Sequence, residues 1–142
     1  LSNSFKYTSP GGSILLSVSH TRKDGQGYCQ IAVSDTGIGI PDLVKNKVDG
    51  NMSNMDALNW ALVSGNSTRQ FELGVPRGVG LADLKKFVAV NAGRLTILSS
   101  GVYYDYTANR QEVLEEFPWK SLGTLVCMTI NQDKEHIYVN RK

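Results

Sequence analysis

An aspartate followed by two closely spaced glycines has the clearest chemical potential in this sequence. Residues 35–41 read DTGIGIP and directly follow the apolar run at residues 31–33. A carboxylate at the end of a buried strand can accept a hydrogen bond from a ligand amino group. Gly37 and Gly39 have no Cβ atom to keep a flat ligand away from the backbone. The segment therefore predicts a ligand-binding loop anchored by Asp35.

A second glycine pair, Gly78 and Gly80, precedes a segment with helical periodicity that begins near Leu81. Free backbone N–H groups and the positive end of the helix dipole would face this loop, which makes it a ready anion site. Three basic residues could add positive charge for phosphates: Arg77, Arg69 and Lys6. Glycines before a helix are common for turn reasons alone. Together with the aspartate loop, however, they predict one nucleotide held between two loops.

The composition limits the class of protein. With 142 residues, 41% of them hydrophobic, the chain can bury the core of one globular domain. A net charge of +2 without a basic run gives no reason to expect nucleic-acid or membrane attraction. No apolar stretch approaches the ~20 residues of a membrane span, and no signal peptide is visible, so a cytoplasmic setting is expected. Cys29 and Cys127 lack metal-ligand spacing and are predicted to be reduced.

The first elements must position these groups. Residues 1–8 predict a short helix with Leu1 and Phe5 on a core-facing side. The opposite side carries Asn3, Lys6 and Tyr7, which either form a solvated face or point at one ligand. A chain that begins inside a helix is expected to be a fragment lacking an N-terminal part.

The middle of the chain predicts a hairpin and a lid. Residues 13–21 and 28–34 alternate like strands around a turn at residues 24–27. Residues 41–77 are mostly polar around one apolar helical piece at residues 55–63. A long polar connection of this kind is usually functional or disordered, so it predicts either a mobile lid or a surface insertion.

The last third predicts one helix and three strands. Apolar residues repeat at helical spacing from Leu81 to Val88, and Gly93 suits a left-handed cap. The strands are expected at residues 94–99, 102–106 and 122–131, with a polar connection through residue 116. The predicted fold is α+β, a two-layer sandwich with a mixed, mostly antiparallel sheet and helices on one face. The domain is expected to span residues 1–131, followed by a polar tail at residues 132–142.

The helix at the start of the chain and the glycine-containing segments occur in the order and rough spacing of a known set of sequence motifs. The chain resembles the ATP-binding domain of histidine kinases, from the superfamily shared with gyrase-type topoisomerases, heat-shock chaperone ATPases and mismatch-repair ATPases. LSNSFKYT at residues 1–8 resembles the second half of the family's N box, and the glycine blocks at residues 35–41, 78–81 and 123–124 resemble its G1, G2 and G3 boxes. The resemblance implies a Bergerat-type ATP-binding fold over residues 1 to about 131.

The family implies a role for each residue that matches. Asn3 would coordinate a Mg²⁺ ion that bridges the ATP phosphates, Lys6 would contact phosphate, and Tyr7 would lie near the sugar or phosphates. Asp35 would accept a hydrogen bond from the adenine amino group. The pocket around it would be shaped by Gly37 and Gly39.

The remaining matches concern the lid and the last strand. Gly78, Gly80 and Leu81 would form the lid hinge and the phosphate-facing start of a helix. Thr124 would support the adenine end through its hydroxyl or a water molecule. The family's usual lid motif is replaced by a variant in which Thr68 and Arg69 could reach the phosphates.

The resemblance leaves the catalytic residue unassigned. The family carries an acidic residue or another asparagine four positions before Asn3, where a hydrolytic base is expected, and that position precedes Leu1. Neither His20 nor His136 has the sequence setting of a phosphoacceptor helix. Dimerisation and phosphoacceptor helices are therefore expected upstream, with a possible homodimer.

Two functions remain open. The favoured one is a Mg²⁺-ATP-binding catalytic domain of a histidine-kinase-like protein that serves phosphoryl transfer or ATP hydrolysis in two-component signal transduction. The alternative is a non-catalytic interaction module whose lid closes on ATP and is recognised by a protein partner. A relic fold that binds no nucleotide is a third, weaker option.

Overall fold

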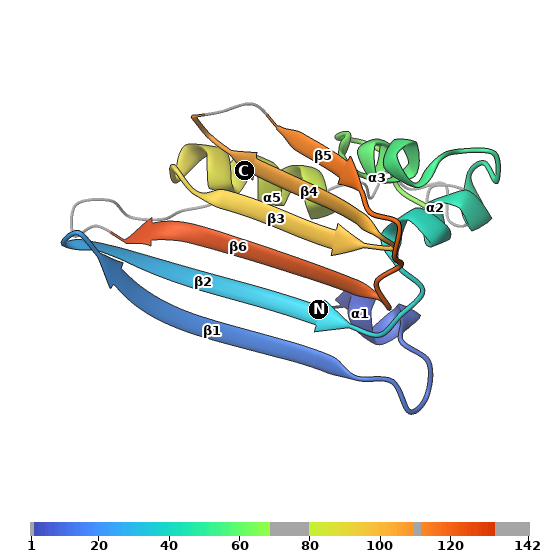
Figure 1. Cartoon of the computed structure of the whole chain (residues 1–142), viewed down its shortest axis with the longest axis horizontal. Coiled ribbons are helices and arrows are strands. Elements are labelled where there is room, and N and C mark those ends of the chain that lie inside the picture. Colours follow the sequence, from blue (N-terminus) through green and yellow to red (C-terminus); the bar gives the residue numbers. More distant parts are fainter. Residues whose placement is uncertain (1, 69–79, 110–111, 133–142) are drawn as a thin grey trace.

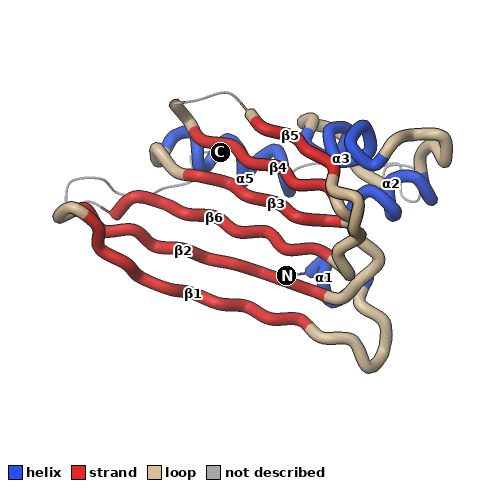
Figure 2. The backbone as a smooth tube through the Cα atoms, viewed as in Figure 1, coloured by secondary structure: helices blue, strands red, loops and turns tan. Residues whose placement is uncertain are grey.

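The protein folds as one antiparallel sheet with helices packed on one of its faces (Figure 1). The computed structural model describes residues 2–68, 80–109 and 112–132, and for residues 2 and 3 it describes the backbone alone. The chain paths of the two layers are also visible in Figure 2. The predicted α+β sandwich is confirmed.

The six described strands are arranged in the order β1-β2-β6-β3-β4-β5, and each pairing between them is antiparallel. They are β1 (Ile14–Lys23), β2 (Gln26–Asp35), β3 (Arg94–Ser99), β4 (Val102–Thr107), β5 (Val113–Glu116) and β6 (Thr124–Gln132). The last strand, β6, lies between β2 and β3 and so joins the two hairpins.

Four described helices complete the fold: α1 (Ser2–Tyr7), α2 (Ile40–Lys47), α3 (Asn54–Leu62) and α5 (Gly80–Val90). The start of α3 is specified locally, because Ser53 is its N-cap and accepts a hydrogen bond from the Asp56 backbone N–H at 3.0 Å. The β1–β2 and β3–β4 hairpins turn at residues 24–25 and 100–101. Both residues of each turn have positive φ, as tight two-residue turns of this type require. None of the helices in the described ranges is both long and apolar enough to span a bilayer.

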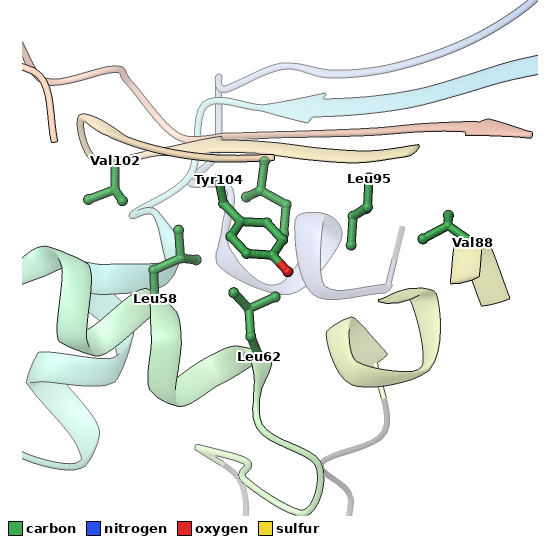
Figure 3. Close-up of a cluster of buried hydrophobic side chains, with 7 residues drawn as sticks. Leu58, Leu62, Val88, Leu95, Val102 and Tyr104 are labelled. Carbon is green, nitrogen blue, oxygen red and sulfur yellow. The ribbon is translucent and has the colours of Figure 1, made fainter. Parts of the chain in front are cut away.

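The core lies between β3, β4 and the helices α3 and α5 (Figure 3). Its buried members come from both layers: Leu58, Leu62, Val88, Leu95, Ile97, Val102 and Tyr104. The only polar side-chain atom among these seven residues, the Tyr104 hydroxyl oxygen, has a hydrogen-bond partner, because the hydroxyl donates to Glu112 Oε2 at 3.0 Å. Burial and the Glu112 carboxylate raise the pKa of Tyr104, so the hydroxyl stays protonated.

The other half of the same sheet face is much more open. By register, Leu16 of β1 lies in one row with Val33, Val126 and Ile97, so it points to the face that the helices cover. Leu16 is nevertheless 48% exposed, whereas Ile97 is fully buried. Burial therefore falls steeply from β3 towards the edge strand β1.

Two elements differ from the sequence prediction. The polar connection before residue 116 contains β5, a four-residue edge strand paired with β4, so four strands follow α5 instead of three. The segment after Gly39 forms α2, where no helix was predicted. The sheet has no parallel pairing among its described strands, so it is antiparallel rather than mixed.

Both cysteines are free, as predicted. They lie in paired strands but on opposite faces of the sheet: Cys29 shares its face with Ile130, whereas Cys127 lies opposite Ala32. Both are half-buried, and burial raises the pKa of the Cys127 thiol.

Candidate functional site

Three polar side chains form a row across adjacent strands at one end of the sheet. In the antiparallel register Asp35 of β2 lies opposite Thr124 of β6, and Thr124 lies opposite Ser99 of β3. Residues opposite each other on neighbouring strands place their side chains on the same face, about 5 Å apart. The buried Ile97 is two residues from Ser99, so the row lies on the face that the helices cover. A carboxylate and two hydroxyls thus stand side by side at the edge of the core.

Ser99 connects this row to the loop that follows Asp35. It is fully buried, and its Oγ accepts a hydrogen bond from the Ile40 backbone N–H at 2.8 Å. The same Oγ lies 2.8 Å from Thr124 Oγ1 and 3.3 Å from the carbonyl oxygen of Gly123. One hydroxyl therefore contacts the aspartate loop and the start of β6 at once.

The Asp35 side chain is partly committed to its own loop. Its Oδ1 accepts a hydrogen bond from the Gly37 backbone N–H at 3.0 Å, which closes an Asx turn. Its Oδ2 has no hydrogen-bond donor among the residues that the structure describes. Because Asp35 is only half-buried, this oxygen can accept a hydrogen bond from a ligand.

The glycines of the site are required by close backbone contacts. A Cβ atom at Gly37 would lie 2.7 Å from the Tyr7 carbonyl oxygen, so the aspartate loop rests on the end of α1. Gly39 and Gly123 have φ of 87° and 74°, a region that favours glycine. A Cβ atom at Gly123 would overlap the Asp35 carbonyl oxygen. These contacts bring α1, the aspartate loop and the start of β6 together (Figure 1).

Helix α2 begins directly after the aspartate loop and is held by two serines of the β3–β4 hairpin. Its N-cap residue, Gly39, has no capping side chain, and Ser99 instead accepts from the first helical N–H. Ser100 Oγ donates to Asp42 Oδ2 at 2.7 Å, and Lys45 pairs with Asp42 at 3.2 Å. Burial alone would raise the pKa of Asp42, but the Ser100 hydroxyl and the Lys45 ammonium outweigh it, so its pKa lies below the ordinary 3.8.

The end of α1, which carries Lys6 and Tyr7, lies against the aspartate loop. Lys6 is exposed, with its Nζ 5.1 Å from the ring centroid of Tyr7, which is half-buried. The side chain of Asn3 is outside the described residues, so its metal role stays a prediction. Phe5 was predicted to face the core, and this was wrong, because its side chain is 72% exposed.

The residues predicted to contact phosphate are only partly described. Thr68 is half-buried in a turn after α3, whereas Arg69 and Gly78 lie outside the described residues. Gly80 is the exposed first residue of α5, as predicted for a helix start. The Leu81 side chain packs against the core, so a ligand contact there would involve its backbone.

Two cavities of the structure are lined by residues outside the row of polar side chains. One of about 520 Å³ lies behind the β3–β4 turn and is lined by Asn54, Ser100, Glu116, Phe117, Pro118 and Lys120. The other, of about 280 Å³, lies between α3, α5 and β4. Neither is lined by Asp35 or Thr124. Within the described part of the chain, no three side chains of the His, Cys, Asp or Glu type gather as a metal site.

Sequence reasoning did not single out the two serines of the β3–β4 hairpin. Ser99 contacts residues that are 24 to 59 positions away, so no local motif announces its role. One signal was present: Ser99 continues the alternation of the buried Leu95 and Ile97, which places a hydroxyl at a core-facing position.

Comparison with known proteins identifies the family of this chain. Residues 1–133 match the family described as histidine kinase-, DNA gyrase B-, and HSP90-like ATPase. The chain is also 35% identical over 99 residues to the hybrid signal transduction histidine kinase D of Dictyostelium discoideum. That match covers 68% of this chain but only 6% of the kinase, so the chain corresponds to a small part of this relative. With the family's aspartate-glycine block at the end of β2 and its last glycine block at the start of β6, the chain belongs to the family of histidine kinase-, DNA gyrase B- and HSP90-like ATPases, as a histidine-kinase-like ATP-binding domain.

Proposed function

We propose that this domain binds Mg²⁺-ATP at the row of polar side chains and serves phosphoryl transfer or ATP hydrolysis in a signal-transducing kinase. The adenine amino group would donate to Asp35 and the adenine end would rest near Thr124. The triphosphate would extend to the start of α5, because the first backbone N–H groups of a helix favour anions. The observation that carries the proposal is the shared row of Asp35 and Thr124, with Gly37 and Gly123 keeping the backbone close to it.

The chemistry of the described residues suits an adenine ring at this position. Asp35 Oδ2 offers an acceptor to the adenine amino group, and Gly37 lets the loop that carries this carboxylate pack closely against the end of α1. A purine is also apolar on its two faces, and the row lies next to the core cluster rather than on the solvent face of the sheet.

Magnesium would bind here as a partner of the phosphates. Among the described residues, no three His, Cys, Asp or Glu side chains gather as a metal site. Mg²⁺ keeps several water ligands and usually takes one or two protein oxygens together with phosphate oxygens. Asn3 on α1 would supply such an oxygen, and the ion would neutralise phosphate charge when bound.

Isothermal titration calorimetry tests this proposal. The unmutated protein is expected to bind ATP with a micromolar to submillimolar Kd that depends on Mg²⁺. Asp35→Asn replaces an acceptor by a group that also donates, and it should weaken binding roughly ten- to hundred-fold, as for the loss of one charged hydrogen bond. Asp24→Asn in the exposed β1–β2 turn is the matched control and should leave the Kd unchanged. Equal affinities of the Asp35 variant and the unmutated protein would contradict the assignment.

A non-catalytic, ATP-dependent interaction module is the second candidate. It is favoured by the exposed Phe5 on α1, an aromatic side chain on the helix that borders the aspartate loop. Radiolabelled ATP separates the two functions: phosphate release or transfer by the full-length protein supports the catalytic domain. Tight ATP binding without either would support the interaction module.

A further inference from the structure

We propose that Ser99 is a positioning residue that turns the Thr124 hydroxyl into a hydrogen-bond acceptor, and thereby makes the site select a 6-amino purine over a 6-oxo purine. The inference rests on the proposed nucleotide site and deepens it by naming what sets its base specificity. It is carried by the hydrogen bonds of one buried hydroxyl.

The Ser99 hydroxyl has three polar contacts, which its one hydrogen and two lone pairs must serve. A serine hydroxyl has one hydrogen and two lone pairs. The Ile40 backbone N–H occupies one lone pair, at 2.8 Å. The carbonyl oxygen of Gly123, at 3.3 Å, cannot donate and therefore requires the Ser99 hydrogen. The remaining contact, 2.8 Å to Thr124 Oγ1, can then be a hydrogen bond only if Thr124 donates to Ser99.

If Ser99 donated its hydrogen to Thr124 instead, the Gly123 carbonyl would lose its hydrogen bond from Ser99. If Ser99 donated to Thr124, the contact between Ser99 and the Gly123 carbonyl would bring two acceptors together without a hydrogen. Ser99 and Gly123 are both buried, and buried polar groups without a hydrogen bond are destabilising. The network with all three contacts satisfied is the one in which Thr124 gives its hydrogen to Ser99.

This assignment has a consequence for the ligand. With its hydrogen directed at Ser99, Thr124 Oγ1 presents only lone pairs to its surroundings. Asp35, which lies opposite Thr124, likewise presents only lone pairs through Oδ2. Two neighbouring acceptors suit the two hydrogens of a 6-amino group, whereas a 6-oxo group would bring a third acceptor against them.

The effect of the neighbouring serine differs, which provides a matched control. Ser100 is also buried and also holds α2, but through its hydroxyl bond to the Asp42 carboxylate. Within the described residues, the Ser100 hydroxyl forms no hydrogen bond with Thr124 or Gly123. Ser100→Ala should therefore lower stability without changing base selectivity, while Ser99→Ala should change both.

The test compares ATP with inosine triphosphate (ITP), whose base carries a 6-oxo group in place of the amino group and a hydrogen on N1. Calorimetry should show that the unmutated protein prefers ATP. Ser99→Ala frees the Thr124 hydrogen, so it should reduce the ATP-to-ITP preference at least ten-fold, whereas Ser100→Ala should retain the preference. In a Thr124→Val background, Ser99→Ala should have no further effect on selectivity. If Ser99→Ala does not fold, Ser99→Cys gives the same comparison, because it leaves no cavity and its thiol is only a weak hydrogen-bond donor and acceptor.

The outcomes separate this inference from the proposed function. Absence of ATP binding by the unmutated protein would overturn both. ATP binding with a clear preference over ITP that Ser99→Ala or Ser99→Cys leaves unchanged would overturn the role of Ser99 alone. If Ser99→Ala and Ser100→Ala lost the preference for ATP over ITP equally, the loss would come from a general loosening of α2. That result would also overturn the role of Ser99.

Discussion

At the scale of single residues, Gly123 carries the closest backbone contact of the site. Its φ of 74° and the proximity of the Asp35 carbonyl leave no room for a side chain. Gly123→Ala should therefore combine backbone strain with a steric clash and cost roughly 2 to 5 kcal/mol of unfolding free energy. Because the clash displaces the end of β2, ATP binding should fall as well. Urea unfolding and calorimetry measure the two effects.

Gly25 is the control that separates the clash from the strain. It has a φ of 80°, close to that of Gly123, but a Cβ atom added there would have no neighbouring atom within 4 Å. Gly25→Ala should cost only about 1 to 2 kcal/mol, from the left-handed backbone alone, and should leave ATP binding intact. Equal destabilisation by the two substitutions would show that the start of β6 can move away from Asp35.

The candidate binding residues that the sequence singled out are those with local signals. Asp35 ends an apolar strand and is followed by glycines, and the structure places it opposite Thr124 in the same row. Ser99 could not be predicted to join them, because its contacts arise only when β3, β6 and the aspartate loop meet. Its core-facing place in the alternation of β3 is a local signal, but it does not say which groups the hydroxyl contacts.

At the scale of elements, the start of α2 depends on charge. The pKa of Asp42 is lowered in the folded protein, since the Ser100 hydroxyl and the Lys45 ammonium favour the carboxylate more than burial opposes it. A carboxyl group with a lowered folded pKa stabilises the fold fully above its unfolded value, near 3.8. This contribution is lost as the pH falls through the lower, folded pKa.

Acid titration of the unfolding free energy tests this role of Asp42. The unmutated protein should lose more stability than Asp42→Asn between about pH 5 and pH 2, because the variant has no proton to take up at this position. Above pH 5 the difference between the two proteins should be constant. Parallel curves across the acid range would show that Asp42 has the same pKa in the folded and unfolded chain.

The elements that were missed share a physical cause. Helix α2 has no capping side chain of its own and obtains its cap from Ser99, which is 59 residues away. Strand β5 has four residues at the edge of the sheet, and only its pairing with β4 makes it a strand. By contrast, the β1–β2 hairpin and α5 were predicted because turn residues and helical periodicity are local signals.

At the scale of the whole molecule, stability is distributed unevenly across one sheet face. The helices α3 and α5 cover β3 and β4, where Leu95 is fully buried. On β1 the same face of the sheet is open, and Leu16 is 48% exposed. Both residues point to the helix side of the sheet, so the difference reflects where the helices pack rather than the pattern of the strands.

Matched truncations should reveal this gradient. Leu95→Ala removes buried methyl groups and leaves a cavity, and it should lower the unfolding free energy by about 2 to 5 kcal/mol. Leu16→Ala removes the same atoms from a half-exposed site without a cavity and should cost roughly 1 kcal/mol or less. Denaturant unfolding of the two variants measures the difference, and comparable losses would mean that the β1–β2 edge is as tightly packed as the centre. If the gradient holds, opening of the fold starts at the edge strand β1, whereas the row of Asp35, Thr124 and Ser99 stays attached to the well-packed part through β3 and β6.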